Sequence, residues 1–253
     1  ARCRHEGAAR GARVHGLMGS KGEGVSTLSR PDWMSRAQAV LFDMDGTLID
    51  SEHLAGQAID QFLRDQGVQM DLENHWYHGR TWRSIADHLQ TQSSALSHMS
   101  VATDLEILFR EALVHSPPRP IPGAPHAVIR AASQTKTAIV SSSDRRSVLH
   151  IVDRFGFSDV LDQVITAEDV ERSKPDPQCF QLAAQRLGVD ADRCVVFEDS
   201  VAGVLAANAA GMRTISVGSN EAARRLADLS IKDFRSLGSD FFGRVDASVD
   251  LKR

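Results

Sequence analysis

Short, wholly apolar runs alternate with amphipathic segments along most of the chain, and the first clear run is Ala39–Phe42. It is apolar at every position and ends abruptly, which predicts a buried parallel strand. Asp43 and Asp45 follow at once, with Gly46 directly after them. Open α/β sheets bind ligands in the loops at the carboxyl ends of their strands. We therefore expect the rest of the chain to be organised around this loop.

The residues after the first strand show helical spacing without an intervening strand. Helices are expected over residues 52–66, around 82–90 and over 101–114. The proline-rich stretch 116–123 then forms a stiff connection, which is typical of a domain boundary. The pattern predicts a separate helical subdomain, residues 52–116, inserted after the first strand.

Beyond residue 123, strand-like and helix-like segments alternate. Strands are expected at 136–140, 163–165, 194–197 and 213–217, and helices at 145–155, 177–187 and 201–210. Alternation of this kind produces βαβ units and a parallel sheet covered on both faces. We predict an α/β fold with a Rossmann-like, doubly wound parallel sheet. Residues 37–51 and 117–240 form this core, and 241–253 form a C-terminal tail.

The first 36 residues do not show this pattern. They are rich in Gly and Arg and contain no apolar stretch of signal-peptide length. We expect residues 1–36 to be a disordered leader outside the fold, either an extension or upstream translation with Met34 as a natural start. Glu6, Glu23 and Asp32 argue against a transit peptide, but organellar targeting by the leader stays open.

Composition narrows the function classes. The 253 residues are 42% hydrophobic, with a formal net charge of −4 and pI near 6.2. No basic cluster large enough for nucleic acid follows the leader, and no apolar run could span a bilayer. The three cysteines lack metal-type spacing. We expect a cytoplasmic monomer or weak dimer with no nucleic-acid or membrane partner.

Asp43 and Asp45 repel each other if both are charged, by about 4 kcal/mol at 4 Å and an effective dielectric near 20. A fold tolerates such a pair where a cation binds or where the chemistry requires it. The plainer alternative is that the two acids only begin a turn. A helix–loop–helix calcium site fits poorly, because Leu41 would stand where the first oxygen ligand is needed.

Three further expected strands are also followed by polar groups. These groups are Ser141-Ser142-Ser143-Asp144, Lys174 and Glu198-Asp199-Ser200. Each alone has an ordinary explanation, as a helix cap or a solvated loop residue. Because parallel strands end at the same edge of a sheet, we expect these groups to meet there. Two acid pairs, a lysine and a serine-lined helix start suit phosphate chemistry with Mg²⁺, since no His or Cys ligand lies nearby.

Four sequence motifs together resemble the haloacid dehalogenase superfamily. In order, they are Asp43-Met44-Asp45-Gly46-Thr47, Ser141, Lys174-Pro175-Asp176-Pro177 and Glu198-Asp199-Ser200-Val201-Ala202-Gly203. The chain is similar to the branch that contains β-phosphoglucomutase-like enzymes and sugar phosphatases, in which a helical cap follows the first motif. The resemblance covers residues 37–217.

This resemblance implies roles for particular residues. Asp43 would attack phosphorus to give an aspartyl-phosphate, and Asp45 would act as the general acid and base. Phosphate would be held by Ser141, Ser142 and Lys174. Mg²⁺ would be held by Asp43, Asp199, the main-chain carbonyl of Asp45 and Glu198, the last directly or through water.

The resemblance further implies a Mg²⁺-dependent phosphatase acting on a small phosphorylated metabolite, a sugar or polyol phosphate. The alternative is a hexose-phosphate mutase. The similar mutases carry a histidine in the first cap helix where this chain has Ala55, and His53 lies on another side of that helix. A distant alternative is a non-catalytic module that binds a cation or phosphate. Arg80, in His78-Gly79-Arg80-Thr81, is equally a substrate contact or a surface arginine paired within the cap.

Overall fold

The computed structural model describes residues 27–72, 76–77 and 80–243. Its centre is a six-stranded parallel sheet in the order β5-β4-β1-β6-β7-β8. The strands are β1 (Ala39–Phe42), β4 (Lys136–Val140), β5 (Gln163–Ile165), β6 (Cys194–Glu198), β7 (Arg213–Val217) and β8 (Leu229–Ile231). The predicted parallel sheet is confirmed, and the five predicted strands agree with the observed ones to within one residue.

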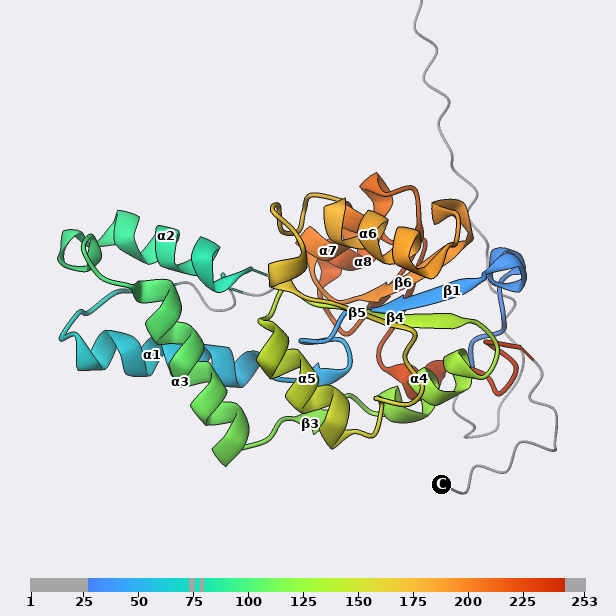
Figure 1. Ribbon diagram of the computed structural model, residues 1–253, viewed down its shortest axis with the longest axis horizontal. Helices are drawn as coiled ribbons and strands as arrows, with labels where there is room; N and C mark the ends of the chain where they lie inside the picture. The colour runs from blue at the N-terminus through green and yellow to red at the C-terminus, as the bar shows by residue number, and fades with distance from the viewer. Residues whose placement is uncertain (1–26, 73–75, 78–79, 244–253) are drawn as a thin grey trace, which may run out of the picture.

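Helices cover both faces of the sheet (Figure 1). One face carries α6 (Gln178–Leu187), α7 (Val201–Ala209) and α8 (Glu221–Leu226), and the other carries α4 (Ala124–Ala132) and α5 (Arg145–Arg154). Side chains of β1 alternate between these layers, with Ala39 and Leu41 on the α6–α7 side and Val40 and Phe42 on the other. This is the predicted doubly wound arrangement. No helix was predicted at the position of α4.

The predicted helical subdomain, called the cap below, is a helical layer beside the sheet, at the left of Figure 1. It consists of α1 (Glu52–Asp65), α2 (Trp82–Gln92) and α3 (Val101–His115). These helices share their own apolar cluster, which includes Phe62, Leu89 and Leu105. The chain enters and leaves the cap through an antiparallel ribbon of β2 (Ile49–Asp50) and β3 (Arg119–Pro120). The cap and the sheet are therefore connected by two adjacent strands.

The core extends beyond both predicted boundaries. Leu28 pairs with Leu237, and a 3-10 helix at Asp32–Arg36 buries Met34 completely against the sheet. Phe241 and Phe242 are buried against the ring of Phe197. The expectation of a leader outside the fold is therefore wrong for residues 27–36, and the tail cannot begin at 241. The short apolar pairs Trp33-Met34 and Phe241-Phe242 stand in polar surroundings and gave no periodic signal for either contact.

Four more 3-10 helices complete the described elements: Ser94–Leu96, Ala167–Asp169, Ala191–Arg193 and Phe234–Ser236. Within the described residues, every helix is too short or too polar to cross a membrane.

Candidate active site

The central strands end level with one another and bring distant polar residues to one edge of the sheet. Phe42 of β1 lies beside Ile139 of β4 and Phe197 of β6. The residues that follow these strands therefore project from neighbouring positions. The predicted meeting of the four motifs at one edge is observed.

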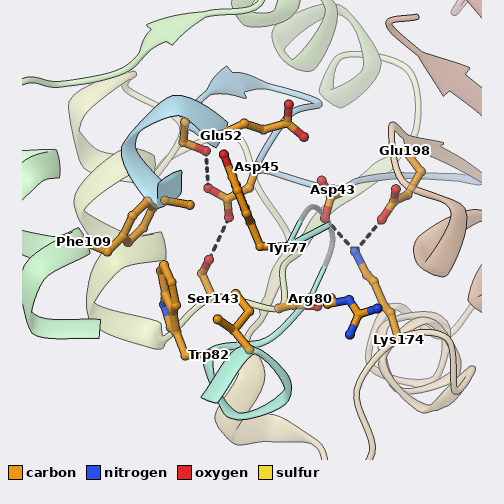
Figure 2. A pocket seen from close by; sticks show the side chains of 14 residues that line it. Asp43, Asp45, Glu52, Tyr77, Arg80, Trp82, Phe109, Ser143, Lys174 and Glu198 are labelled. Atoms are coloured by element: carbon orange, nitrogen blue, oxygen red, sulfur yellow. Dashed lines mark hydrogen bonds and ion pairs between the residues drawn. The ribbon is translucent and has the colours of Figure 1, made fainter. Parts of the chain in front are cut away.

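Lys174 joins the first and last motifs. Its Nζ donates to Asp43 Oδ1 at 2.6 Å and to Glu198 Oε1 at 2.8 Å (Figure 2). It also donates to the carbonyl of Val140 at 3.1 Å. Lys174, Asp43 and Glu198 are all buried. Burial opposes the charge of Lys174, but attraction to Asp43 and Glu198 outweighs burial and raises the pKa of Lys174. Lys174 is therefore held as a cation beside the predicted nucleophile.

Asp45 lies in a cradle of hydroxyl groups. Its carboxylate accepts hydrogen bonds from Ser51 Oγ at 2.5 Å, Ser143 Oγ at 2.7 Å and, more weakly, Ser141 Oγ at 3.4 Å. Burial raises the pKa of Asp45 and outweighs the opposing effect of the serine hydrogen bonds. A raised pKa favours the protonated carboxyl, which is the form that a general acid requires. Ser51 and Ser143 were not predicted as site residues, although Ser143 belongs to the serine run expected at this edge.

The serine loop after β4 is fixed by its own hydrogen bonds. Ser141 Oγ accepts from the main-chain N–H of Ser143 at 3.0 Å. Asp144 caps α5 by accepting from the N–H of Ser147 at 3.0 Å. Ser142 lines the cavity and is half-buried, whereas Ser141 is buried. The phosphate-binding roles of Ser141 and Ser142 stay predictions.

Asp199 approaches the first loop closely. Thr47 Oγ1 donates to Asp199 Oδ1 at 3.1 Å. Gly46 has φ +82°, and a Cβ at this position would collide with the Asp199 carboxylate. Gly46 is therefore needed both for its backbone conformation and for its lack of a side chain.

Asp43, Glu198 and Asp199 form an acidic cluster suited to a metal ion. Each offers a carboxylate oxygen, and these oxygens lie within 4.8 Å of one another. Burial raises the pKa of Asp43 to about 7, despite the opposing attraction of Lys174. Desolvation, together with the charges of Glu198 and Asp43, raises the pKa of Asp199 well above its ordinary value. An all-oxygen donor set whose charges repel one another fits a hard divalent cation. The predicted contribution of Asp45 through its carbonyl stays a prediction.

Glu198 is oriented by its other carboxylate oxygen. Oε2 accepts from the N–H of Ser200 at 2.7 Å and from its hydroxyl at 2.9 Å. Ser200 is the N-cap of α7 and accepts in turn from the N–H of Gly203. Glu198 is thus an acceptor for Lys174 as well as a member of the acidic cluster.

A cavity that is partly open to solvent lies between the cap and the edge of the sheet. Its core side is lined by Asp43, Asp45, Ser51, Ser142, Ser143, Lys174 and Glu198. Its cap side is lined by Glu52, Ala55, Tyr77, Arg80, Trp82, Ile85 and Phe109. The cavity is therefore polar where phosphate would bind and largely aromatic or aliphatic on the opposite side.

The cap residues that line the cavity are only partly those that the sequence pointed to. Arg80 is exposed, reaches the cavity and lies 5.7 Å from the ring centroid of Trp76. Its two alternatives, a substrate contact or a cap pairing, thus both stay open. Tyr77, in a turn, and Phe109, in α3, were missed, because an aromatic residue in a cavity wall gives the same sequence signal as one in a core. His78 and Gly79 lie outside the described residues.

Comparisons with known proteins agree with these features. A family model described as haloacid dehalogenase-like hydrolase matches residues 37–211. Validoxylamine A 7'-phosphate phosphatase of Streptomyces hygroscopicus subsp. limoneus is 32% identical, covering 78% of this chain and 93% of that protein. Fructose-1-phosphate phosphatase YqaB of Escherichia coli K12 is 30% identical, covering 72% and 97%.

Two further matches are a much longer relative and a solved structure with a similar fold. Protein SUPPRESSOR OF QUENCHING 1, chloroplastic, of Arabidopsis thaliana is 32% identical over 85% of this chain, but the match spans only 22% of that protein. The solved structure of β-phosphoglucomutase from Clostridium difficile has a TM-score of 0.70 at 24% identity, covering 80% of this chain and 93% of that one. This likeness concerns the fold. Since the family model covers most of the chain, the resemblance is confirmed: the chain belongs to the haloacid dehalogenase-like hydrolases.

Proposed function

We propose that this hydrolase is a phosphatase of small phosphomonoesters, a sugar or polyol phosphate, and that it works through an aspartyl-phosphate on Asp43. The observation that carries the proposal is the 2.6 Å contact between Lys174 Nζ and Asp43 Oδ1, with Asp45 lining the same cavity. The two relatives named as phosphatases act, by their names, on phosphorylated sugar-like compounds.

In the first half-reaction a carboxylate oxygen of Asp43 attacks phosphorus, and the bond from phosphorus to the substrate oxygen breaks. Asp45 gives its proton to the departing alkoxide. In the second half, Asp45 takes a proton from a water molecule that attacks the same phosphorus, which releases inorganic phosphate and restores Asp43. The raised pKa of Asp45 supports the acid role in the first half.

Charge must be neutralised before a carboxylate can approach a phosphate dianion. Lys174 supplies one positive charge next to Asp43. We propose that Mg²⁺ would be held by Asp43, Asp199 and the carbonyl of Asp45, with Glu198 nearby. When bound, it supplies positive charge that stabilises the phosphoryl oxygens. The apolar wall of the cap would exclude bulk water from the reacting atoms.

A phosphatase is favoured over a mutase by the residue at position 55. Ala55 lines the cavity, and its methyl group can neither donate nor accept a proton. The non-catalytic alternative is disfavoured because Asp43, Asp45, Lys174 and Asp199 all keep the polar groups that the reaction needs. The cytoplasmic location and the monomeric or weakly dimeric state stay predictions.

The test is phosphate release from a panel of sugar and polyol monophosphates by the purified protein with Mg²⁺. Hydrolysis of at least one compound to the free alcohol is expected. In a separate arm, a hexose 1-phosphate is supplied with a hexose bisphosphate activator. Formation of the 6-phosphate without release of free sugar would contradict the proposal and favour the mutase.

A further inference from the structure

We propose that Tyr77 is a specificity-determining residue for the substrate's alcohol part, and that Gly56 sets the position of its ring. This inference rests on the proposed phosphatase function and concerns the same cavity.

Gly56 lies inside α1, where glycine destabilises a helix by about 0.5–1 kcal/mol relative to alanine. Its backbone does not need glycine, since only the glycines with positive φ do so and Gly56 is not among them. A Cβ at Gly56 would lie 2.5 Å from the hydroxyl oxygen of Tyr77 and 3.3 Å from its Cζ. The missing side chain therefore makes room for the Tyr77 hydroxyl against the helix.

Tyr77 then presents its ring to the cavity. Figure 2 shows its side chain among those that line the cavity, together with Trp82 and Phe109. The rings of Trp82 and Phe109 are themselves in contact, with centroids 5.1 Å apart. Tyr77 is half-buried, and burial and the carboxylates of Glu52 and Asp60 raise its pKa. At neutral pH its hydroxyl thus keeps its proton.

The two sides of the cavity would contact different parts of the substrate. The core side holds the charged and hydroxyl groups that would bind the phosphate, and every phosphomonoester carries the same phosphate. Selection among substrates must therefore come from the cap side, where the alcohol part meets aromatic rings. Aromatic faces provide large, rigid contact area, and the C–H groups of a sugar or polyol can pack on them. Moving Tyr77 would change which carbon skeleton fits.

The experiment compares Gly56→Ala, Tyr77→Phe and the double variant, with Gln57→Ala as a control. Gln57 is exposed on the same helix, one residue from Gly56. Values of kcat/KM are measured for the best sugar or polyol phosphate and for acetyl phosphate, whose acetyl group is smaller than a sugar or polyol and offers less surface to the aromatic rings. Thermal unfolding is followed for each variant.

Gly56→Ala is expected to change the ratio of the two kcat/KM values by roughly tenfold or more, the scale of a changed pocket contact. Its Tm is expected to stay close to that of the parent, because the gain in helix propensity offsets the cost of displacing the half-buried tyrosine ring. In the double variant the tyrosine hydroxyl is gone and the nearest ring atom is Cζ. The added methyl group then lies 3.3 Å from Cζ, so the ring has to move by only a few tenths of an ångström, and the ratio returns toward that of Tyr77→Phe. Gln57→Ala is expected to keep the parent ratio.

An active parent enzyme whose ratio is unchanged in Gly56→Ala would overturn this inference and leave the proposed function standing. A double variant with no return toward Tyr77→Phe would overturn the coupling of the two residues. A parent that releases phosphate from no compound would overturn the proposed function, and the inference with it.

Discussion

The Glu198 carboxylate occupies the space in which a side chain at Gly203 would lie. Gly203 is buried in the first turn of α7, and its N–H donates to Ser200 Oγ. The same carboxylate accepts from Lys174 at 2.8 Å. The close approach of helix α7 to Glu198 therefore helps to set the position of the lysine beside Asp43.

Gly203→Ala is expected to destabilise the protein by about 1–3 kcal/mol, the usual effect of inserting atoms into a packed site. At an exposed helix position the same change would stabilise by about 0.5–1 kcal/mol. Phosphate release should fall as well, because Glu198 must move away from Lys174. Chemical denaturation and a phosphatase assay measure both effects. Leu205→Ala, at an exposed position of α7, is the control. Full activity with a raised Tm in Gly203→Ala would contradict this packing argument.

Lys174→Met would leave the carboxylates of Asp43 and Glu198 buried without their cation. Removing one partner of a buried ion pair typically costs about 3–5 kcal/mol, and we expect a loss on that scale. Activity should fall by about 10² or more, since a charge that stabilises the transition state is lost. Unfolding by urea, with and without Mg²⁺, measures the first effect. Lys232→Met, at an exposed position, should change neither quantity. A Lys174→Met protein as stable and active as the parent would refute the role of Lys174 as the cation that neutralises Asp43 and Glu198.

The stability of the metal-free protein should fall as pH rises toward neutrality. Asp43 has a folded-state pKa of about 7 against an ordinary 3.8, and the pKa of Asp199 is also raised. Between the ordinary and the raised pKa, the folded chain binds more protons than the unfolded chain, so rising pH favours unfolding.

Mg²⁺ binds the deprotonated carboxylates, so the stabilisation that it provides should grow over the same rise in pH. Thermal unfolding with EDTA and with MgCl₂, from about pH 5 to about pH 8, measures this difference. Asp199→Asn should reduce the increase in Tm that Mg²⁺ produces at every pH. A shift in Tm on adding Mg²⁺ that does not depend on pH would contradict the proposed site.

Arg110 connects the cap to the loop that holds Ser143. Its Nη2 lies 3.7 Å from Asp144 Oδ1, across the boundary between α3 and α5. Arg110→Met should raise KM by roughly threefold to tenfold and change kcat less, because the cap would close less firmly over the substrate. Stability should change by less than about 1 kcal/mol, since the arginine is about a third exposed and such pairs are weak.

Steady-state kinetics for Arg110→Met are compared with Arg83→Met, which alters an exposed arginine of α2. The control should keep the parent KM. If Arg110→Met also kept it, the contact would have no part in closing the cap.

The sequence predicted the strands and motif residues because their signals are local. Ala39–Phe42 is apolar throughout and is followed by acids, which identifies both a buried strand and a ligand loop. Gly56 and Tyr77, by contrast, are far apart in the chain and meet only because of the way in which the cap folds. Met34 gave no periodic signal and was assigned to the leader, although it is completely buried. Contacts of this kind depend on tertiary packing, and local sequence patterns contain no direct signal of such packing.

The most direct test of the mechanism is to locate the phosphoryl group during turnover. The enzyme is mixed with substrate and Mg²⁺, quenched rapidly in acid, and mapped by mass spectrometry of its peptides. We predict a phosphoryl group on Asp43 in the parent, and neither this adduct nor turnover in Asp43→Asn. A phosphoryl group on another residue, or full turnover by Asp43→Asn, would contradict the mechanism.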